Sequence, residues 1–332
     1  MAASFDIFNP NVTVVAKGLA GKSMLIYGGN SLGKTAQSVR MSKPFVIAAE
    51  SGLNATSNIP YARITSWAQF IKIVKQFTDK GTVDKAREMY DTIIIDEMYA
   101  VSLLCQDYVI ATYGNGALTL GDSEGKVNLY QVYEKQFFKA INLLLSCDYT
   151  VVFIGHAQQD KNGYITPKGD KRCVDPIRDF VDYVIYLESN GVDENNNVIN
   201  SSAYLAETDR FFARSRFKYT PTYIKEFTAE NLEKAIVEGI EKEEQINGIK
   251  TVTYAEQKAQ NTADAIDYDA TMEALQDIGM RFAESNNMDV LTEIVENTLG
   301  VGKKVTECTK KQIDAMCIIL DDLKEKAREL NI

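Results

Sequence analysis

Long apolar runs alternate with amphipathic stretches along the first two thirds of the chain. Residues 25–27, 44–49, 92–95 and 149–155 are apolar without a break, which is typical of strands buried on both faces of a parallel sheet. Between them, residues 67–78 carry apolar side chains at helical spacing and are predicted to form a helix that packs on the core. We therefore expect an α/β fold in which a mostly parallel sheet is flanked by helices.

Further elements follow from the same two patterns. Additional strands are predicted at 12–16, 182–188, 203–207 and around 211–217. Additional helices are predicted at about 34–41 and 130–146. Residues 112–129 and 158–177 are polar, contain several glycines and show no periodicity, so they are predicted to be long loops. Long loops inside a compact domain usually serve a function.

From residue 229 onward the pattern becomes helical. An amphipathic helix is predicted at 229–246, followed by a polar linker at 250–267. Thr309 and Gln312 have the spacing of a capping box at the start of a last helix, whose apolar stripe consists of Ile313, Met316, Cys317, Leu320 and Leu323. The predicted organisation is a core at 1–228, a helix and linker at 229–267, and a small helical domain at 268–332.

Composition narrows the class of protein. The chain has 332 residues, of which 45% are hydrophobic and 25% are charged. It contains no 18-residue apolar run and no basic-then-apolar start, which argues against a membrane span and a secretory signal. Five widely spaced cysteines and a single histidine make a structural zinc site improbable and predict reduced thiols. We expect a cytoplasmic protein, in the host cell if it is phage-encoded.

Negative charge is concentrated near the end of the chain. The net charge is −10, and residues 251–332 hold 16 acidic and 9 basic side chains. The rest of the chain is therefore close to neutral. This balance argues against an indiscriminate polyanion binder, but a basic loop on the core could still contact nucleic acid.

Residues 28–35 have the pattern Gly-x-x-x-x-Gly-Lys-Thr, directly after an apolar strand and before a predicted helix. This is the context that a P-loop requires. Its glycines let successive N–H groups turn toward a polyphosphate, its lysine reaches the β- and γ-phosphates, and its threonine can ligate Mg²⁺. The expected ligands are ATP and Mg²⁺. The nucleotide-binding residues are Gly28, Gly29, Asn30, Ser31, Leu32, Gly33, Lys34 and Thr35.

Carboxylates follow two of the predicted strands. Asp96 ends the strand at 92–95, in the position of a Walker B acid, and is predicted to bind Mg²⁺ together with Thr35. Hydrolysis also needs a carboxylate that positions or deprotonates water. Both Glu50, after the strand at 44–49, and Glu97, beside Asp96, could serve, and either could instead be an ordinary exposed carboxylate.

Other polar residues fall where catalysis or DNA binding would place them. His156 follows the strand at 149–155 and could hydrogen-bond to the γ-phosphate or be a structural histidine. Arg214 and Arg216 are two residues apart, so on a strand both side chains lie on one face. They could reach the phosphates bound by a neighbouring subunit, or they could belong to a basic strand that only faces solvent. The candidate DNA-binding residues are Lys161, Tyr164, Lys168, Lys171 and Arg172 in the second loop and, more weakly, Tyr113 and Lys126 in the first, with ordinary loop polarity as the alternative.

The chain resembles the RecA family of ATPases over about residues 20–228. AAESGLNAT (48–56) is similar to the family's strand that ends in its catalytic glutamate, and TIIIDEMYAV (92–101) is similar to its Walker B strand. Residues 121–156 resemble its first DNA-binding loop with the helix and strand that follow. ARSRF (213–217) falls where RecA has two lysines that reach the ATP of the next subunit.

The resemblance implies a RecA-like core in which Glu50 is the catalytic base. His156 replaces the family's usual glutamine, and no RecA-like N-terminal polymerisation helix is recognisable. Within the family, the compact core looks most like phage-encoded ATPases that assist single-strand annealing. The expected function is ATP hydrolysis by an oligomer bound to single-stranded DNA in phage-type recombination or replication, with the C-terminal domain recruiting a protein partner.

Two other functions stay open. One is an AAA+ or helicase-like motor or loader that acts on a protein or a duplex, with Glu97 as its base. The other is a nucleotide-gated interaction protein with negligible turnover.

Overall fold

The computed structural model describes residues 12–50, 56–122, 127–257 and 266–332. They form two compact units, a larger one at Val14–Tyr254 and a smaller one built on Ala255–Ile332. No helix of the described residues is long and apolar enough to cross a membrane.

The larger unit is built on a mixed sheet with the strand order β11-β9-β8-β2-β6-β5-β3-β4. The strands from β8 to β4 run parallel, whereas β9, β10 and β11 pair antiparallel at one side and β7 folds back antiparallel on β6. The bounds are β2 Ser23–Gly28, β3 Pro44–Ala48, β4 Tyr61–Arg63, β5 Thr92–Asp96, β6 Thr150–Gln159, β7 Ile165–Pro167, β8 Tyr183–Glu188, β9 Ser202–Tyr204, β10 Arg214–Ser215 and β11 Tyr223–Ile224.

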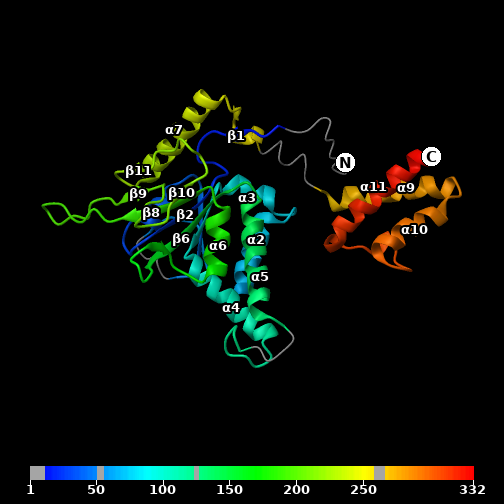
Figure 1. Cartoon of the computed structure of the whole chain (residues 1–332), viewed down its shortest axis with the longest axis horizontal. Coiled ribbons are helices and arrows are strands. Elements are labelled where there is room, and N and C mark those ends of the chain that lie inside the picture. The colour runs from blue at the N-terminus through cyan, green and yellow to red at the C-terminus, as the bar shows by residue number, and fades with distance from the viewer. Residues whose placement is uncertain (1–11, 51–55, 123–126, 258–265) are drawn as a thin grey trace. The chain divides into compact units, whose positions relative to one another are not determined.

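Helices cover both faces of this sheet (Figure 1). One face is covered by α2, α4, α5 and α6, and the other by α1 and α7. Their bounds are α1 Lys34–Ser38, α2 Trp67–Thr78, α3 Val83–Met89, α4 Met98–Tyr113, α5 Leu129–Leu145, α6 Lys171–Phe180 and α7 Ala229–Asn247. This arrangement confirms the predicted α/β class.

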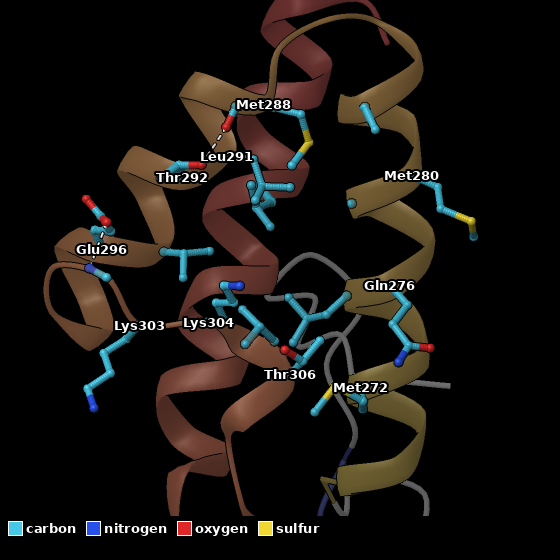
Figure 2. A pocket seen from close by; sticks show the side chains of 17 residues that line it. Met272, Gln276, Met280, Met288, Leu291, Thr292, Glu296, Lys303, Lys304 and Thr306 are labelled. Carbon is cyan, nitrogen blue, oxygen red and sulfur yellow. Dashed lines mark hydrogen bonds between the residues drawn. The ribbon is translucent and has the colours of Figure 1, made fainter.

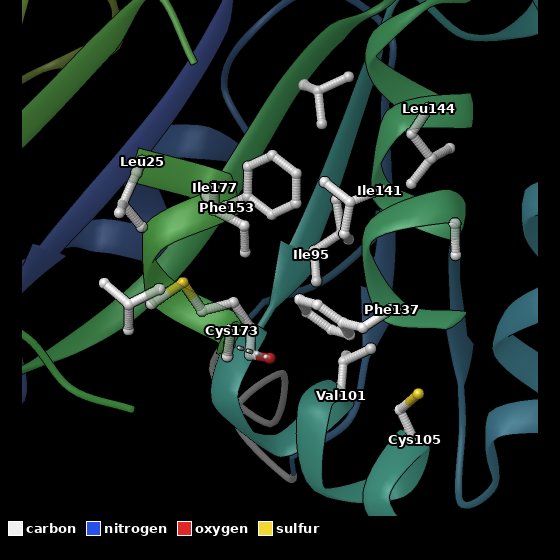
Figure 3. Packing of buried hydrophobic residues seen from close by; sticks show 14 of the residues in the cluster. Leu25, Ile95, Val101, Cys105, Phe137, Ile141, Leu144, Phe153, Cys173 and Ile177 are labelled. Carbon is white, nitrogen blue, oxygen red and sulfur yellow. Dashed lines mark hydrogen bonds between the residues drawn. The ribbon is translucent and has the colours of Figure 1, made fainter. Parts of the chain in front are cut away.

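Alternation along each strand explains the continuous apolar runs. Leu25 and Phe153 point toward α4, α5 and α6, whereas their chain neighbours Met24 and Val152 point toward the face that α7 covers. Figure 3 shows the first face, where Leu25 and Phe153 belong to one buried cluster with Phe137 of α5 and Ile177 of α6. Because both faces are buried, most residues of a central strand are apolar.

Helix α7 packs on the sheet through its buried side chains, which include Leu232 and Ile236. The predicted segment 229–267 is therefore divided in the structure, because its helix belongs to the core of the larger unit. Part of the predicted linker is also ordered, since β12 (Thr251–Val252) pairs in parallel with β1 (Val15–Ala16).

The second predicted loop is partly wrong. Residues 158–177 contain the strand β7 and most of helix α6. Asp170 caps this helix by accepting a hydrogen bond from the backbone N–H of Arg172 at 2.9 Å, and Val174 and Ile177 are buried beneath it. Pro176 and the charged residues conceal this short apolar stripe in the sequence.

Among its described residues, the smaller unit has three main helices around its own core. They are α9 Tyr268–Glu284, α10 Met288–Leu299 and α11 Ile313–Leu330. The predicted capping box at Thr309 and Gln312 is present and leads through a short 3₁₀ turn into α11. The predicted stripe is confirmed at Met316, Leu320 and Leu323, which are buried.

Candidate functional site

The P-loop connects the carboxyl end of β2 to the start of α1. Gly33 precedes the helix with a φ of 83°, a left-handed conformation that favours glycine. The Lys34 ammonium donates to the carbonyl oxygens of Gly28 at 3.1 Å and Gly29 at 2.5 Å, so the side chain lies folded against the loop. Burial lowers the pKa of Lys34, while Asp96 and nearby glutamates favour its charged form. The loop thus holds a buried cation beside its backbone.

Thr35 and Asp96 meet next to this loop. The Thr35 hydroxyl donates to Asp96 Oδ2 at 2.9 Å. Strand β6 separates β2 from β5, and the parallel register brings the carboxyl ends of all three strands to one edge. Burial raises the pKa of Asp96, although the hydrogen bond from Thr35 favours the ionised form. A hydroxyl and a carboxylate in contact are the hard oxygen ligands that suit Mg²⁺.

Glu50, Glu97 and His156 converge at the same edge. Each offers one possible ligand atom, and these atoms lie within 4.8 Å of one another. His156 Nε2 lies 3.8 Å from Glu50 Oε2. Glu50 and Glu97 therefore belong to one cluster, and their proximity alone does not decide which of them is the catalytic base.

The surroundings of the two glutamates differ. Glu97 is buried and caps α4, accepting from the backbone N–H groups of Tyr99 and Ala100 at 3.1 Å each. Burial raises the pKa of Glu97 to about 7, against the effect of these hydrogen bonds. Glu50 is exposed and lines the open cavity beside the P-loop.

That cavity has a volume of about 410 Å³ and lies directly against the first part of the loop. Its lining consists of residues 28–30, Glu50, His156, Ala157 and Lys168. Sequence reasoning placed Lys168 in a DNA-binding loop, whereas the structure places it beside the nucleotide loop. Only the pairing of β7 with β6 brings it there, and no local sequence signal indicates that pairing.

Arg214 and Arg216 share one side of their segment, as predicted, but both contact the end of α6. Arg214 donates to the carbonyl oxygens of Arg178 and Val181 at 2.8 Å each, and Arg216 donates to that of Asp179 at 2.9 Å. Cations suit these carbonyls because the end of a helix carries partial negative charge. β10 pairs near the amino end of β8, so the pair lies at the opposite end of the strands from the P-loop.

The remaining candidates for DNA binding are scattered. Lys161 is exposed in the turn between β6 and β7, whereas the Tyr164 hydroxyl donates to Glu207 at 2.5 Å. Lys171 and Arg172 begin α6, and the Arg172 guanidinium lies 4.4 Å from the ring centroid of Tyr130. Tyr113, a further predicted contact, is the last residue of α4. Lys126, the other one, lies outside the described residues.

A separate pocket of about 570 Å³ lies in the smaller unit, between α9, α10 and the segment that follows α10. Figure 2 shows Met272, Met288 and Leu291 lining it, with Lys303 and Lys304 nearby. Its largely apolar lining suits an apolar ligand or peptide better than a polyphosphate.

Comparisons with known proteins agree with this geometry. Residues 20–217 match the family described as AAA domain, which is well over half of the chain. Over 331 residues the chain is 49% identical to the SPbeta prophage-derived uncharacterized protein YorG of Bacillus subtilis (strain 168). That match covers 98% of this chain and 100% of the relative.

Proposed function

Because this chain belongs to the AAA domain family, we propose that it is a Mg²⁺-dependent ATPase with a RecA-like catalytic arrangement. The proposal is carried by the placement of Glu50, which lines the cavity beside the P-loop. Glu97 lies close by, but its carboxylate oxygens accept hydrogen bonds from the backbone N–H groups in the first turn of α4. Of the two glutamates, Glu50 is therefore the one free to face a water molecule in the cavity.

The residues of the site divide the work of hydrolysis. Lys34 and the loop N–H groups bind the β- and γ-phosphates. Thr35 and Asp96 would hold Mg²⁺, which neutralises charge on the phosphate oxygens when it is bound. Glu50 orients the attacking water and takes up its proton, and His156, 3.8 Å from Glu50, helps to hold that carboxylate in place.

The active form is proposed to be a homo-oligomer. Arg214 and Arg216 lie at the far end of the strands from their own P-loop, so within one subunit they cannot reach its phosphates. They could instead supply positive charge to the transition state at the P-loop of a neighbouring subunit, as arginine fingers do. To do so, they would exchange carbonyl partners at the end of α6 for phosphate oxygens.

Single-stranded DNA is the proposed polymer partner, in recombination, annealing or replication. The prophage origin of the relative supports this setting. The exposed Lys161 lies at the tip of the β6–β7 hairpin, whose base adjoins the nucleotide cavity. A hairpin of this kind can connect the nucleotide to a bound strand.

Replacing Lys161 with alanine is expected to weaken binding of a single-stranded oligonucleotide a few-fold and to reduce the salt dependence of the affinity by about one phosphate contact. Fluorescence anisotropy at several salt concentrations measures both. Lys85→Ala is the matched control, because Lys85 is an exposed lysine on α3, which leads into the amino end of β5. Equal effects of the two variants would show that the hairpin is not part of the DNA-binding surface.

A second function is favoured by one observation. Glu97 directly follows Asp96 and lies within 4.8 Å of Glu50 and His156, as the base of a motor or loader ATPase would. Such an enzyme would act on a protein or a duplex. The apolar pocket of the smaller unit would suit a protein partner in either case.

Phosphate release from ATP and Mg²⁺, measured with and without single-stranded DNA, tests the proposal. Stimulation by single-stranded DNA is the expected result. Turnover stimulated only by a duplex or a protein would favour the motor or loader. Nucleotide binding without turnover in any of these conditions would indicate a nucleotide-gated interaction protein.

A further inference from the structure

We infer that Lys168 is a second phosphate-binding cation of the nucleotide site, one that contacts the γ-phosphate from the cavity beside the P-loop. The inference rests on the proposed function, because it assigns the cavity beside the P-loop to the γ-phosphate and the attacking water. It removes Lys168 from the DNA-binding residues and makes it part of the ATPase site.

The position of Lys168 is fixed by the backbone on both sides. Its N–H donates to the carbonyl oxygen of His156 at 2.8 Å, which closes the base of the β6–β7 hairpin. Next to it, Gly169 has a φ of 148°, where a Cβ would lie 3.0 Å from Val174 and 3.3 Å from Tyr99. A larger residue there would be strained, so the turn that presents Lys168 requires glycine.

The chemistry of the cavity needs a cation at this place. Of the described residues that line it, Lys168 alone is a lysine or arginine, and Glu50 brings a negative charge. The γ-phosphate would add further negative charge beside that carboxylate. Lys34 lies folded against the carbonyls of Gly28 and Gly29 and is not among the residues that line the cavity. A lysine ammonium at the cavity itself would stabilise the charge that spreads over the γ-phosphoryl oxygens during transfer.

Lys168 also has room to move toward a phosphate. Its side chain is exposed, and its ammonium lies 5.8 Å from the ring centroid of Tyr99, a weak contact that a phosphate can replace. Because Lys168 and His156 share a backbone hydrogen bond, binding of the γ-phosphate would act on both strands of the hairpin that carries Lys161 at its tip. Lys168 would thereby let the hairpin distinguish ATP from ADP.

The test compares the affinities of the full chain for ADP and for a non-hydrolysable ATP analogue, both with Mg²⁺ and a fluorescent label. Lys168→Ala should weaken binding of the analogue about tenfold and that of ADP less than about twofold, because ADP has no γ-phosphate. Lys168→Arg keeps the positive charge and should retain part of the wild-type preference for the analogue over ADP. Lys85→Ala, which removes one exposed lysine from α3, is the control for the loss of a positive charge and should leave both affinities unchanged.

An unchanged ratio of the two affinities in Lys168→Ala overturns the inference. If that variant also binds single-stranded DNA more weakly in the absence of nucleotide, Lys168 belongs to the DNA-binding surface instead. A wild-type chain that binds the analogue but does not hydrolyse ATP would overturn only the proposed function. A wild-type chain that binds neither nucleotide would overturn both.

Discussion

Replacing Lys34 with methionine is expected to lower ATP turnover by about a thousandfold or more. The change removes the buried cation that is proposed to contact the β- and γ-phosphates, but it keeps most of the side-chain volume. It should leave the melting temperature of the nucleotide-free protein unchanged or slightly raised. Burial already lowers the pKa of Lys34, so the charged group is costly to hold inside the loop.

Phosphate release and thermal melting measure these two effects. ATP with Mg²⁺ should raise the melting temperature of the wild-type protein but not that of Lys34→Met, since only a bound ligand shifts the unfolding equilibrium. Lys43→Ala is a suitable control, because Lys43 is a lysine beyond α1 whose side chain is 52% exposed. Full turnover in Lys34→Met would rule out the P-loop as the site of hydrolysis.

Glu50→Gln is expected to lower kcat by at least about a hundredfold, because glutamine keeps the shape of the side chain but cannot accept a proton. Glu97→Gln should have a much smaller effect on kcat. Its main consequence should be in α4, where weaker capping of the Tyr99 and Ala100 N–H groups would cost about 1 kcal/mol of stability.

Steady-state phosphate release and chemical denaturation of the two variants distinguish these expectations. The pair is matched, since each variant loses one carboxylate of the same cluster. The reverse order of kcat values would make Glu97 the base and would favour the motor or loader ATPase.

The sheet could be predicted from the sequence because each central strand is buried on both faces. Residues such as Leu25 and Met24 point to opposite faces and are both apolar, so the run itself reveals the strand. The same logic locates Asp96 and Glu50, since the carboxyl ends of parallel strands share one edge.

Helix α6 and several short strands could not be predicted in this way. Only three of the ten residues of α6 are buried, and Pro176 lies inside it, so this short and largely polar segment has the composition of a loop. Strand β10 falls within the strand predicted around 211–217, whereas β11 was not predicted. Both have only two residues, and the sheet edge that they join, rather than their own sequence, determines their bounds.

The candidate site was only partly visible in the sequence. The motif identifies the P-loop residues, because their chemistry depends on local spacing. The capping role of Glu97 follows from the helix that begins after it, and the partners of Arg214 and Arg216 depend on the end of α6, which was not predicted. The position of Lys168 depends on a hairpin between segments with no recognisable pairing signal.

Glu50 is proposed to activate the water that hydrolyses ATP bound at this P-loop. The most direct test is to identify the nucleotide that remains bound to Glu50→Gln after incubation with ATP, Mg²⁺ and single-stranded DNA, by chromatography of the denatured complex. Glu50→Gln should retain intact ATP, whereas wild type and Glu97→Gln should release ADP and phosphate. ADP on Glu50→Gln together with intact ATP on Glu97→Gln would contradict the claim.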